Sequence, residues 1–449
     1  MAYDTPIYLR NQVIYQIYVR NHGHNGKFAD VTRDLPRIHS MGVDIIYLMP
    51  IHPIGKRNKK GRLGCPYSIY DYKAVNPEYG TLQEFKDLIE TAHSLGMKVM
   101  MDIVFHHTSH DSPLVKSNPE WFYRDDHGCP VSSISDWSDV VDLNFANREL
   151  RQYLIEVLRY WVEVGVDGFR CDVASLIPLD FWLEARQAIK AVKADTIWLA
   201  ESVHTVFVEE CRARGLTAHC DAELFMAFDI AYDYDIWQIW QSAVRGKVPV
   251  SRYLEMQRFQ DCIYPAHSVK LRCVENHDQT RIMKFASTRQ QALAWTALAA
   301  FSKGAFMIYA GQESGAIRTP SLFDTDRIDW GTYDLQPYLT SLIKLKKDVC
   351  QRQGNYYVFQ YEPAVQAIWQ TSNQSLYGIF NVSATTQLLK VLVEDGQYTD
   401  LLTGRALTVS NQLVMPPESA CIFRCQHLHA PKHFFSELID YPYDKTNYQ

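Results

Sequence analysis

Short apolar runs alternate along the chain with segments in which apolar residues recur at helical spacing. The runs are rich in β-branched and aromatic residues, which is typical of buried strands. Eight of them are predicted as strands: residues 13–19, 43–49, 98–105, 166–172, 197–201, about 222–226, 270–275 and 305–309. The predicted helices between them include residues 31–41, 81–95, 148–164 and 289–301. This alternation predicts a parallel sheet with helical crossovers, and eight units favour a closed (β/α)8 barrel, or TIM barrel, over an open sheet.

The alternation is interrupted after the third predicted strand and changes near residue 348. The insertion after the third predicted strand is rich in Ser, Asp, Pro and His. A long insertion at the mouth of a barrel is usually functional. Beyond residue 348, short predicted strands are separated by turn residues, which predicts a small antiparallel β domain of the sandwich type. The predicted division is a barrel over 1–105 and 145–347, an insertion over 106–144, a β domain over 348–426 and a tail over 427–449.

Composition limits the classes of partner and compartment. The chain has 45 Lys and Arg against 51 Asp and Glu, a formal charge of −6, which argues against nucleic acid or an anionic membrane as the main partner. The N-terminal sequence lacks the basic and apolar regions of a secretory signal, and no apolar stretch is long enough to span a membrane. The 10 cysteines are scattered without a C-x-x-C pair, so we expect free thiols and a cytoplasmic protein.

Carboxylates follow several predicted strands, at the end of a barrel that carries chemistry. Asp172, Glu201 and Asp278 are the three main candidates. Arg170 and Asp172 are two positions apart, so both side chains share one face, and the guanidinium should lower the pKa of Asp172. Glu201 follows the apolar run 198–200, which should raise its pKa. Two carboxyls with opposed pKa shifts are typical of glycosidic bond cleavage, although an ion pair and a helix cap are the structural alternatives.

Three histidines follow the third predicted strand and suggest a metal site. His106, His107 and His110 enter a loop rather than a helix, and no H-E-x-x-H sequence is present. The sequence therefore predicts no catalytic transition metal, and packed, hydrogen-bonded histidines are the alternative.

Together these residues resemble the motifs of the α-amylase superfamily, glycoside hydrolase family 13. The four main motifs are matched, in order, by 102–107 (DIVFHH), 168–172 (GFRCD), 199–201 (LAE) and 274–278 (VENHD). Further family segments are matched by 66–72 (PYSIYDY), 76–80 (NPEYG) and 141–144 (VDLN). Each motif is short, but four in the right order at the right strands are specific. The insertion would then be the family's domain B, and the β domain its domain C.

The resemblance implies a retaining α-glucan hydrolase of α-amylase type, which cleaves α-1,4 bonds through a covalent glycosyl-enzyme. It implies that Asp172 is the nucleophile, Glu201 the general acid and base, and Asp278 a ligand of the sugar hydroxyls. It also implies five supporting residues: Tyr67 stacking on the sugar, His107 and His277 hydrogen-bonding it, Arg170 orienting the nucleophile, and Asp102 supporting the loop after the third strand. The two catalytic carboxyls are expected about 5–5.5 Å apart.

Two departures from the family pattern argue against its usual structural calcium. His106 stands where the family usually has an Asn ligand, and an imidazole is a poor ligand for this oxygen-preferring cation. Residues 173–177 also lack the His that many calcium-dependent members place after the nucleophile. We expect no cofactor to be required for the chemistry.

The sequence leaves the balance between hydrolysis and transfer open. A 4-α-glucanotransferase, or a sucrose-type member that transfers α-glucosyl groups, would use the same covalent intermediate. A non-catalytic carbohydrate-binding protein is disfavoured because all three carboxylates are present. The expected substrate is a starch-derived α-glucan or a maltooligosaccharide, while endo or exo action and the oligomeric state are not indicated.

Overall fold

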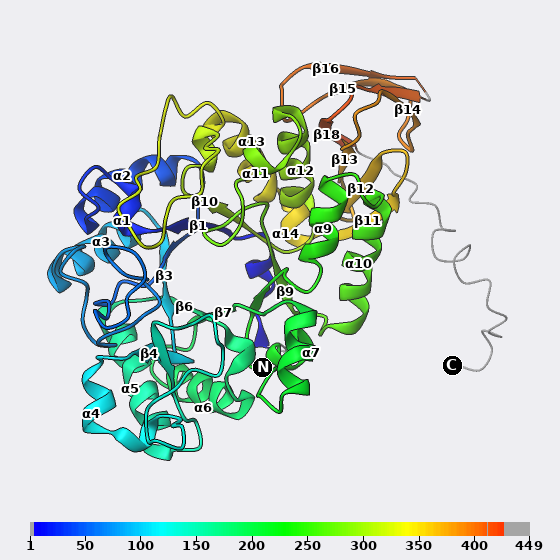
Figure 1. Ribbon diagram of the computed structural model, residues 1–449. Helices are drawn as coiled ribbons and strands as arrows, with labels where there is room; N and C mark the ends of the chain where they lie inside the picture. The colour runs from blue at the N-terminus through cyan, green and yellow to red at the C-terminus, as the bar shows by residue number, and fades with distance from the viewer. Residues whose placement is uncertain (1–3, 411, 426–449) are drawn as a thin grey trace.

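A closed barrel of parallel strands forms the centre of the computed structural model, which describes residues 4–410 and 412–425 (Figure 1). The order around the barrel is β1-β10-β9-β8-β7-β6-β3-β2. The strands are β1 Val13–Ile17, β2 Ile45–Leu48, β3 Lys98–Ile103, β6 Gly168–Cys171, β7 Ile197–Ala200, β8 Ile230–Tyr232, β9 Val269–Arg272 and β10 Ala305–Tyr309. The predicted (β/α)8 barrel is confirmed, while the predicted tail 427–449 lies outside the described residues.

Helices cover the outside of the barrel, and the strands are buried almost throughout, as expected for a parallel sheet covered on both faces. The longer helices are α2 Phe28–Ser40, α3 Leu82–Ser94, α5 Arg148–Val164, α6 Leu179–Lys190, α7 Thr205–Ala213, α9 Trp237–Val244, α10 Val250–Ile263, α12 Arg289–Phe301 and α13 Gln336–Lys346. The short ones are α1 Val19–His22, α4 Pro113–Ser117, α8 Asp221–Leu224, α11 Ile282–Phe285 and α14 Val349–Gln353. The bounds predicted for α5 and α12 agree with the structure.

The sixth strand was predicted at the wrong place. The segment about 222–226 contains α8, and the strand β8 comes later in the chain. Glu223 accepts a hydrogen bond from the backbone N–H of Cys220, so a capping box begins a helix where the apolar run suggested a strand. Asp229, just before β8, accepts from the backbone N–H of Trp198 at 3.0 Å and so holds the true strand against β7. Short apolar runs do not distinguish strand from helix by periodicity alone.

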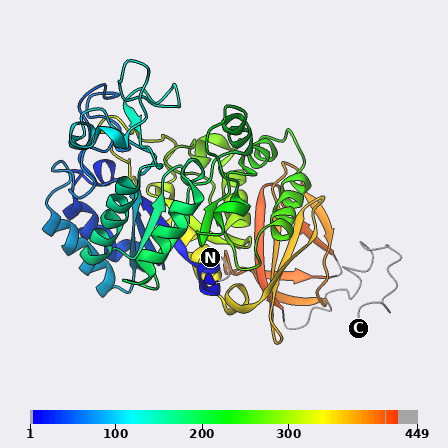
Figure 2. The ribbon, with the colours of Figure 1, turned by 90° about the horizontal axis from the view of Figure 1, so that it is seen from below.

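The insertion after β3 and the C-terminal β domain are both present. The insertion contains an antiparallel pair, β4 His107–Ser109 and β5 Val140–Asp142. In the C-terminal domain, one sheet has the order β11-β12-β13-β18, and two further two-stranded antiparallel sheets pair β14 with β17 and β15 with β16. These strands are β11 Asn355–Gln360, β12 Val365–Gln370, β13 Ser375–Asn381, β14 Gln387–Lys390, β15 Gly396–Thr399, β16 Ala406–Val409, β17 Gln412–Met415 and β18 Ser419–Cys425. Figure 2 shows this domain, in orange, beside the barrel.

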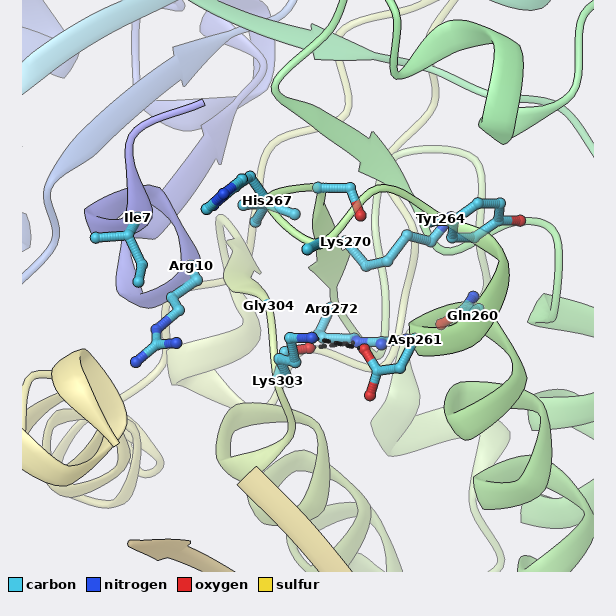
Figure 3. A pocket seen from close by; sticks show the side chains of 13 residues that line it. Ile7, Arg10, Gln260, Asp261, Tyr264, His267, Lys270, Arg272, Lys303 and Gly304 are labelled. Carbon is cyan, nitrogen blue, oxygen red and sulfur yellow. Dashed lines mark hydrogen bonds and ion pairs between the residues drawn. The ribbon is translucent and has the colours of Figure 1, made fainter. Parts of the chain in front are cut away.

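A cavity of about 140 Å³ lies at the N-terminal ends of the barrel strands, where β9 and β10 begin (Figure 3). Three of its cationic side chains are paired with carboxylates, while Arg10 donates hydrogen bonds to backbone carbonyl oxygens. Arg272 lies 2.6 Å from Asp233, and Lys303 lies 2.7 Å from Asp261. Lys270 is buried among acidic side chains and lies 3.0 Å from Asp235. Because these charges are already matched, we interpret this end of the barrel as structural.

The cysteines agree with one of the compositional expectations. All 10 cysteines are free thiols, as predicted. Among the helices of the described residues, none combines the length and the apolar character needed to cross a lipid bilayer. The cytoplasmic location stays a prediction.

Candidate active site

A cleft of about 260 Å³ opens at the C-terminal ends of the barrel strands and brings the predicted site residues together. It is lined by the three candidate carboxylates, Asp172, Glu201 and Asp278, and by Tyr67, His107 and His277. Its other lining residues are Lys60, Cys65, Trp137, Asp139, Val140, Val173, Leu322 and Phe323. Arg170 and Asp102 are completely buried and contact this set through hydrogen bonds and ion pairs. The structure therefore brings all eight predicted site residues together, and their roles stay predictions.

Arg170 on β6 joins three carboxyl groups. Its Nη1 donates hydrogen bonds to Asp102 at 2.8 Å and to Asp172 at 2.7 Å, and its Nη2 lies 2.8 Å from Oε1 of Glu201. The parallel register pairs Asp102 on β3 with Arg170, and the two-residue period of a strand places Arg170 beside Asp172. Glu201 follows the neighbouring strand β7. Three adjacent strands thus direct one cation and three carboxyls to the same point.

Because Asp172 shares Arg170 with two other carboxyls, its expected charge state changes. Burial raises the pKa of Asp172 well above its ordinary value, the neighbouring Glu201 raises it further, and Arg170 opposes the rise. The lower pKa predicted from Arg170 alone is therefore wrong. Burial also raises the pKa of Asp102, to about 6. Because one guanidinium faces three buried carboxyls, the cluster favours binding a proton, and such interacting groups titrate together.

Glu201 is positioned by the turn that follows Asp172. Its Oε2 accepts a hydrogen bond from the backbone N–H of Val173 at 2.8 Å. Val173 has φ +36° and ψ +45°, a left-handed conformation that is rare for a β-branched residue and costs about 1–3 kcal/mol. A strained backbone next to the candidate nucleophile therefore holds the candidate acid. No local sequence signal indicated this role for Val173.

Tyr67 and His277 form a stacked pair within the cleft. Their ring centroids are 5.6 Å apart with an interplanar angle of 17°, and Tyr67 Oη lies 2.6 Å from His277 Nε2. Gln16 on β1 contacts the other ring nitrogen at 2.8 Å. Burial lowers the pKa of His277 to about 3, so its imidazole is neutral at physiological pH. Asp278, whose side chain is 40% exposed, lies at the mouth, 3.1 Å from the same Nε2.

His107 belongs to β4, at the start of the insertion. Burial, reinforced by the adjacent His106, lowers the pKa of His107 well below its ordinary value, so this imidazole is also neutral. Tyr72 donates a hydrogen bond to the carbonyl oxygen of His107 at 2.8 Å. Trp137, from the far part of the insertion, places its ring 5.2 Å from that of His107 and lines the cleft. Trp137 and the supporting Gln16 were missed because their sequence neighbourhoods carry no motif.

The donor set at the insertion does not fit the family's structural calcium. His106 Nδ1 lies 3.2 Å from His107 Nδ1 and 3.7 Å from a carboxylate oxygen of Asp142. The other oxygen of Asp142 accepts a hydrogen bond from the backbone N–H of Ser133 at 2.7 Å. Within residues 4–410 and 412–425, no group of three or more His, Cys, Asp or Glu side chains is arranged to hold a metal. An imidazole therefore stands where a hard cation needs an oxygen ligand.

Comparison with protein families now decides the family. The chain matches the model of the α-amylase catalytic domain over residues 14–127 and 133–331. It belongs to the α-amylase family. Residues 356–423 also match the model of the bacterial α-amylase C-terminal domain. The resemblance drawn from the strand-end motifs is confirmed.

Two solved structures of α-amylases are similar to this α-amylase family member over nearly its whole length. The crystal structure of an α-amylase from Lactobacillus plantarum is 41% identical, covers 94% of this chain and 100% of that chain, and gives a TM-score of 0.90. A noncanonic maltogenic α-amylase, AmyB, from Thermotoga neapolitana is 31% identical with the same coverage and a TM-score of 0.83. Membership of this family makes the protein an enzyme of the glycoside hydrolase class, as predicted.

Curated relatives are similar over only part of their length. The α-amylase MalA of Haloarcula japonica is 26% identical over 77% of this chain and 50% of its own length. An α-1,4-glucan:maltose-1-phosphate maltosyltransferase of Rhodospirillum rubrum is 38% identical over 40% of this chain and 29% of its own length. The chain thus spans half or less of these two proteins, and the relatives include both amylases and transferases.

Proposed function

We propose that this protein is a retaining hydrolase of α-1,4-glucans, such as maltooligosaccharides. The observation that supports this proposal is the joining of Asp172 and Glu201 by one buried Arg170 inside a single cleft. Asp172 attacks the anomeric carbon and forms a glycosyl ester, while Glu201 gives its proton to the departing oxygen. Glu201 then takes a proton from water, which attacks the anomeric carbon and releases Asp172. Two inversions at one carbon retain the α configuration.

The remaining cleft residues suit an uncharged sugar. His107 and His277 are neutral, so neither imidazole adds a charge to the cleft. Tyr67 and Trp137 present aromatic surface to the cleft, against which the apolar face of a pyranose can pack. Asp278 at the mouth supplies acceptors for sugar hydroxyls. These features support an α-glucan rather than an anionic polymer as the substrate.

The maltosyltransferase relatives make transfer the second candidate activity. We expect maltotriose to yield glucose and maltose in equal amounts at early times, because water competes successfully for the glycosyl ester. Chromatography of the first products measures this ratio, and NMR of fresh product should show the α anomer. Early appearance of maltotetraose or longer sugars would instead identify a transferase with the same intermediate.

We also propose that the fold and the activity need no calcium. Dialysis against EDTA should leave the unfolding temperature and the rate on maltooligosaccharides unchanged, because His106 replaces an oxygen donor. Differential scanning calorimetry and initial rates provide the two measurements, with calcium-saturated EDTA as the control. A loss of stability that added Ca²⁺ restores, and Mg²⁺ does not, would contradict this expectation.

A further inference from the structure

Two long loops stand on one side of the cleft, opposite Glu201. They follow β2 (residues 49–81, the β2 loop) and β10 (residues 310–335, the β10 loop). Their strands flank β1, and β1 and β7 are four positions apart in either direction around the barrel order. The strand that precedes Glu201 is therefore diametrically opposite β1, as the ribbon also shows (Figure 1).

The two loops are tied together through the segment that follows β1. Arg20, which is 1% exposed, donates hydrogen bonds to the carbonyl oxygens of Gly64 at 3.2 Å and Leu322 at 2.9 Å. The backbone N–H of Leu63 donates to the carbonyl oxygen of Phe323 at 2.9 Å. This buried cation and the direct backbone contact fix the β2 loop against the β10 loop.

Lys60 extends this connection from the β2 loop to the insertion. Its Nζ donates to the carbonyl oxygen of Asp136 at 2.8 Å and lies 3.1 Å from a carboxylate oxygen of Asp139. The side chain of Asp139 is 5% exposed, so this ion pair is partly shielded from water. Lys60, Asp139, Leu322 and Phe323 all line the cleft, and we call these four residues the wall.

The position of the wall relative to Glu201 gives it a direction along the substrate. The general acid protonates the oxygen of the leaving group, so the leaving group lies on the Glu201 side of the bond that breaks. The sugar that becomes attached to Asp172, and every unit on its non-reducing side, extends the other way, toward the wall. Resting on the proposed function, we propose that the wall stops the glucan there, so that this protein removes short units from non-reducing ends.

A pair of substrates tests the wall directly. Both are maltoheptaosides labelled at the reducing end, and one also carries an ethylidene bridge across the hydroxyls of its non-reducing end. We expect the blocked substrate to be cleaved at least about tenfold more slowly, because its added group meets the wall. The free substrate should first give labelled products only slightly shorter than itself. Equal rates on the two substrates, or early labelled products of every length, would overturn the proposal.

A matched pair of variants tests the part that Lys60 has in the wall. Lys60→Ala removes the contacts with Asp136 and Asp139 and should raise the rate on the blocked substrate, relative to the free one, several-fold. Arg57→Ala, an exposed position on the same loop, should leave this ratio unchanged. Unfolding temperatures of both variants show whether the fold is retained, and an unchanged ratio in folded Lys60→Ala would overturn the role of Lys60. Cleavage of neither substrate by the unaltered protein would contradict the proposed function itself, and the wall proposal with it.

Discussion

Replacing Asp172 by Asn should lower kcat on maltooligosaccharides by about 10⁴-fold or more, as expected when a covalent nucleophile is removed. An amide is too weak a nucleophile to form the glycosyl ester and carries no charge to stabilise the oxocarbenium-like transition state. Arg170 would keep its hydrogen bonds to Asp102, so the geometry around the site should persist. Initial rates of reducing-sugar release measure the effect.

The stability of this variant separates a chemical role from a structural one. Asp172 is one of three buried carboxyls around a single cation, so neutralising it should leave the unfolding temperature equal to or above that of the original protein. Asp180→Asn, whose side chain is 70% exposed and pairs with Arg151, is the matched control and should change neither rate nor stability appreciably. Retention of a tenth of the original activity by Asp172→Asn would exclude it as the nucleophile.

Local signals account for the parts of the molecule that could be predicted from the sequence. The two-residue period of a strand was enough to place Arg170 beside Asp172. The limits of α5 follow from the Asn147 cap, which accepts from the backbone N–H of Leu150, and from Gly165, whose φ of +123° ends the helix. Barrel topology then brought the strand ends together, because all parallel strands of a closed barrel end on the same rim.

Properties that depend on contacts between distant segments could not be predicted in the same way. Whether the pKa of Asp172 is raised or lowered depends on how many buried carboxyls share Arg170. No single sequence motif contains that number. The contact of Leu63 with Phe323 joins two loops whose strands, β2 and β10, lie on either side of β1. The place of Trp137 in the cleft depends on how the insertion folds back onto His107. The left-handed backbone of Val173 is likewise imposed by its surroundings, since valine itself disfavours it.

Glu201→Gln should slow cleavage most for substrates whose leaving group needs a proton. On maltooligosaccharides, whose leaving group is a sugar hydroxyl, kcat should fall by about 10²–10⁴-fold because general acid catalysis is lost. On an α-maltosyl fluoride the first step should be much less impaired, since fluoride leaves without full protonation. The kcat/KM on both substrates, which reports the first step even when the second is limiting, gives the comparison between the original protein and the variant.

The ratio of the two losses decides what Glu201 does. If it is the acid, the loss on the fluoride is far smaller than the loss on the maltooligosaccharide, and the second step becomes limiting because the base that activates water is also missing. If Glu201 acts only by holding Arg170 and the turn at Val173, both substrates lose activity equally. Glu209→Gln on α7, an exposed position, should leave both rates unchanged. Equal losses on the two substrates would therefore remove Glu201 from the chemistry and make it a positioning residue.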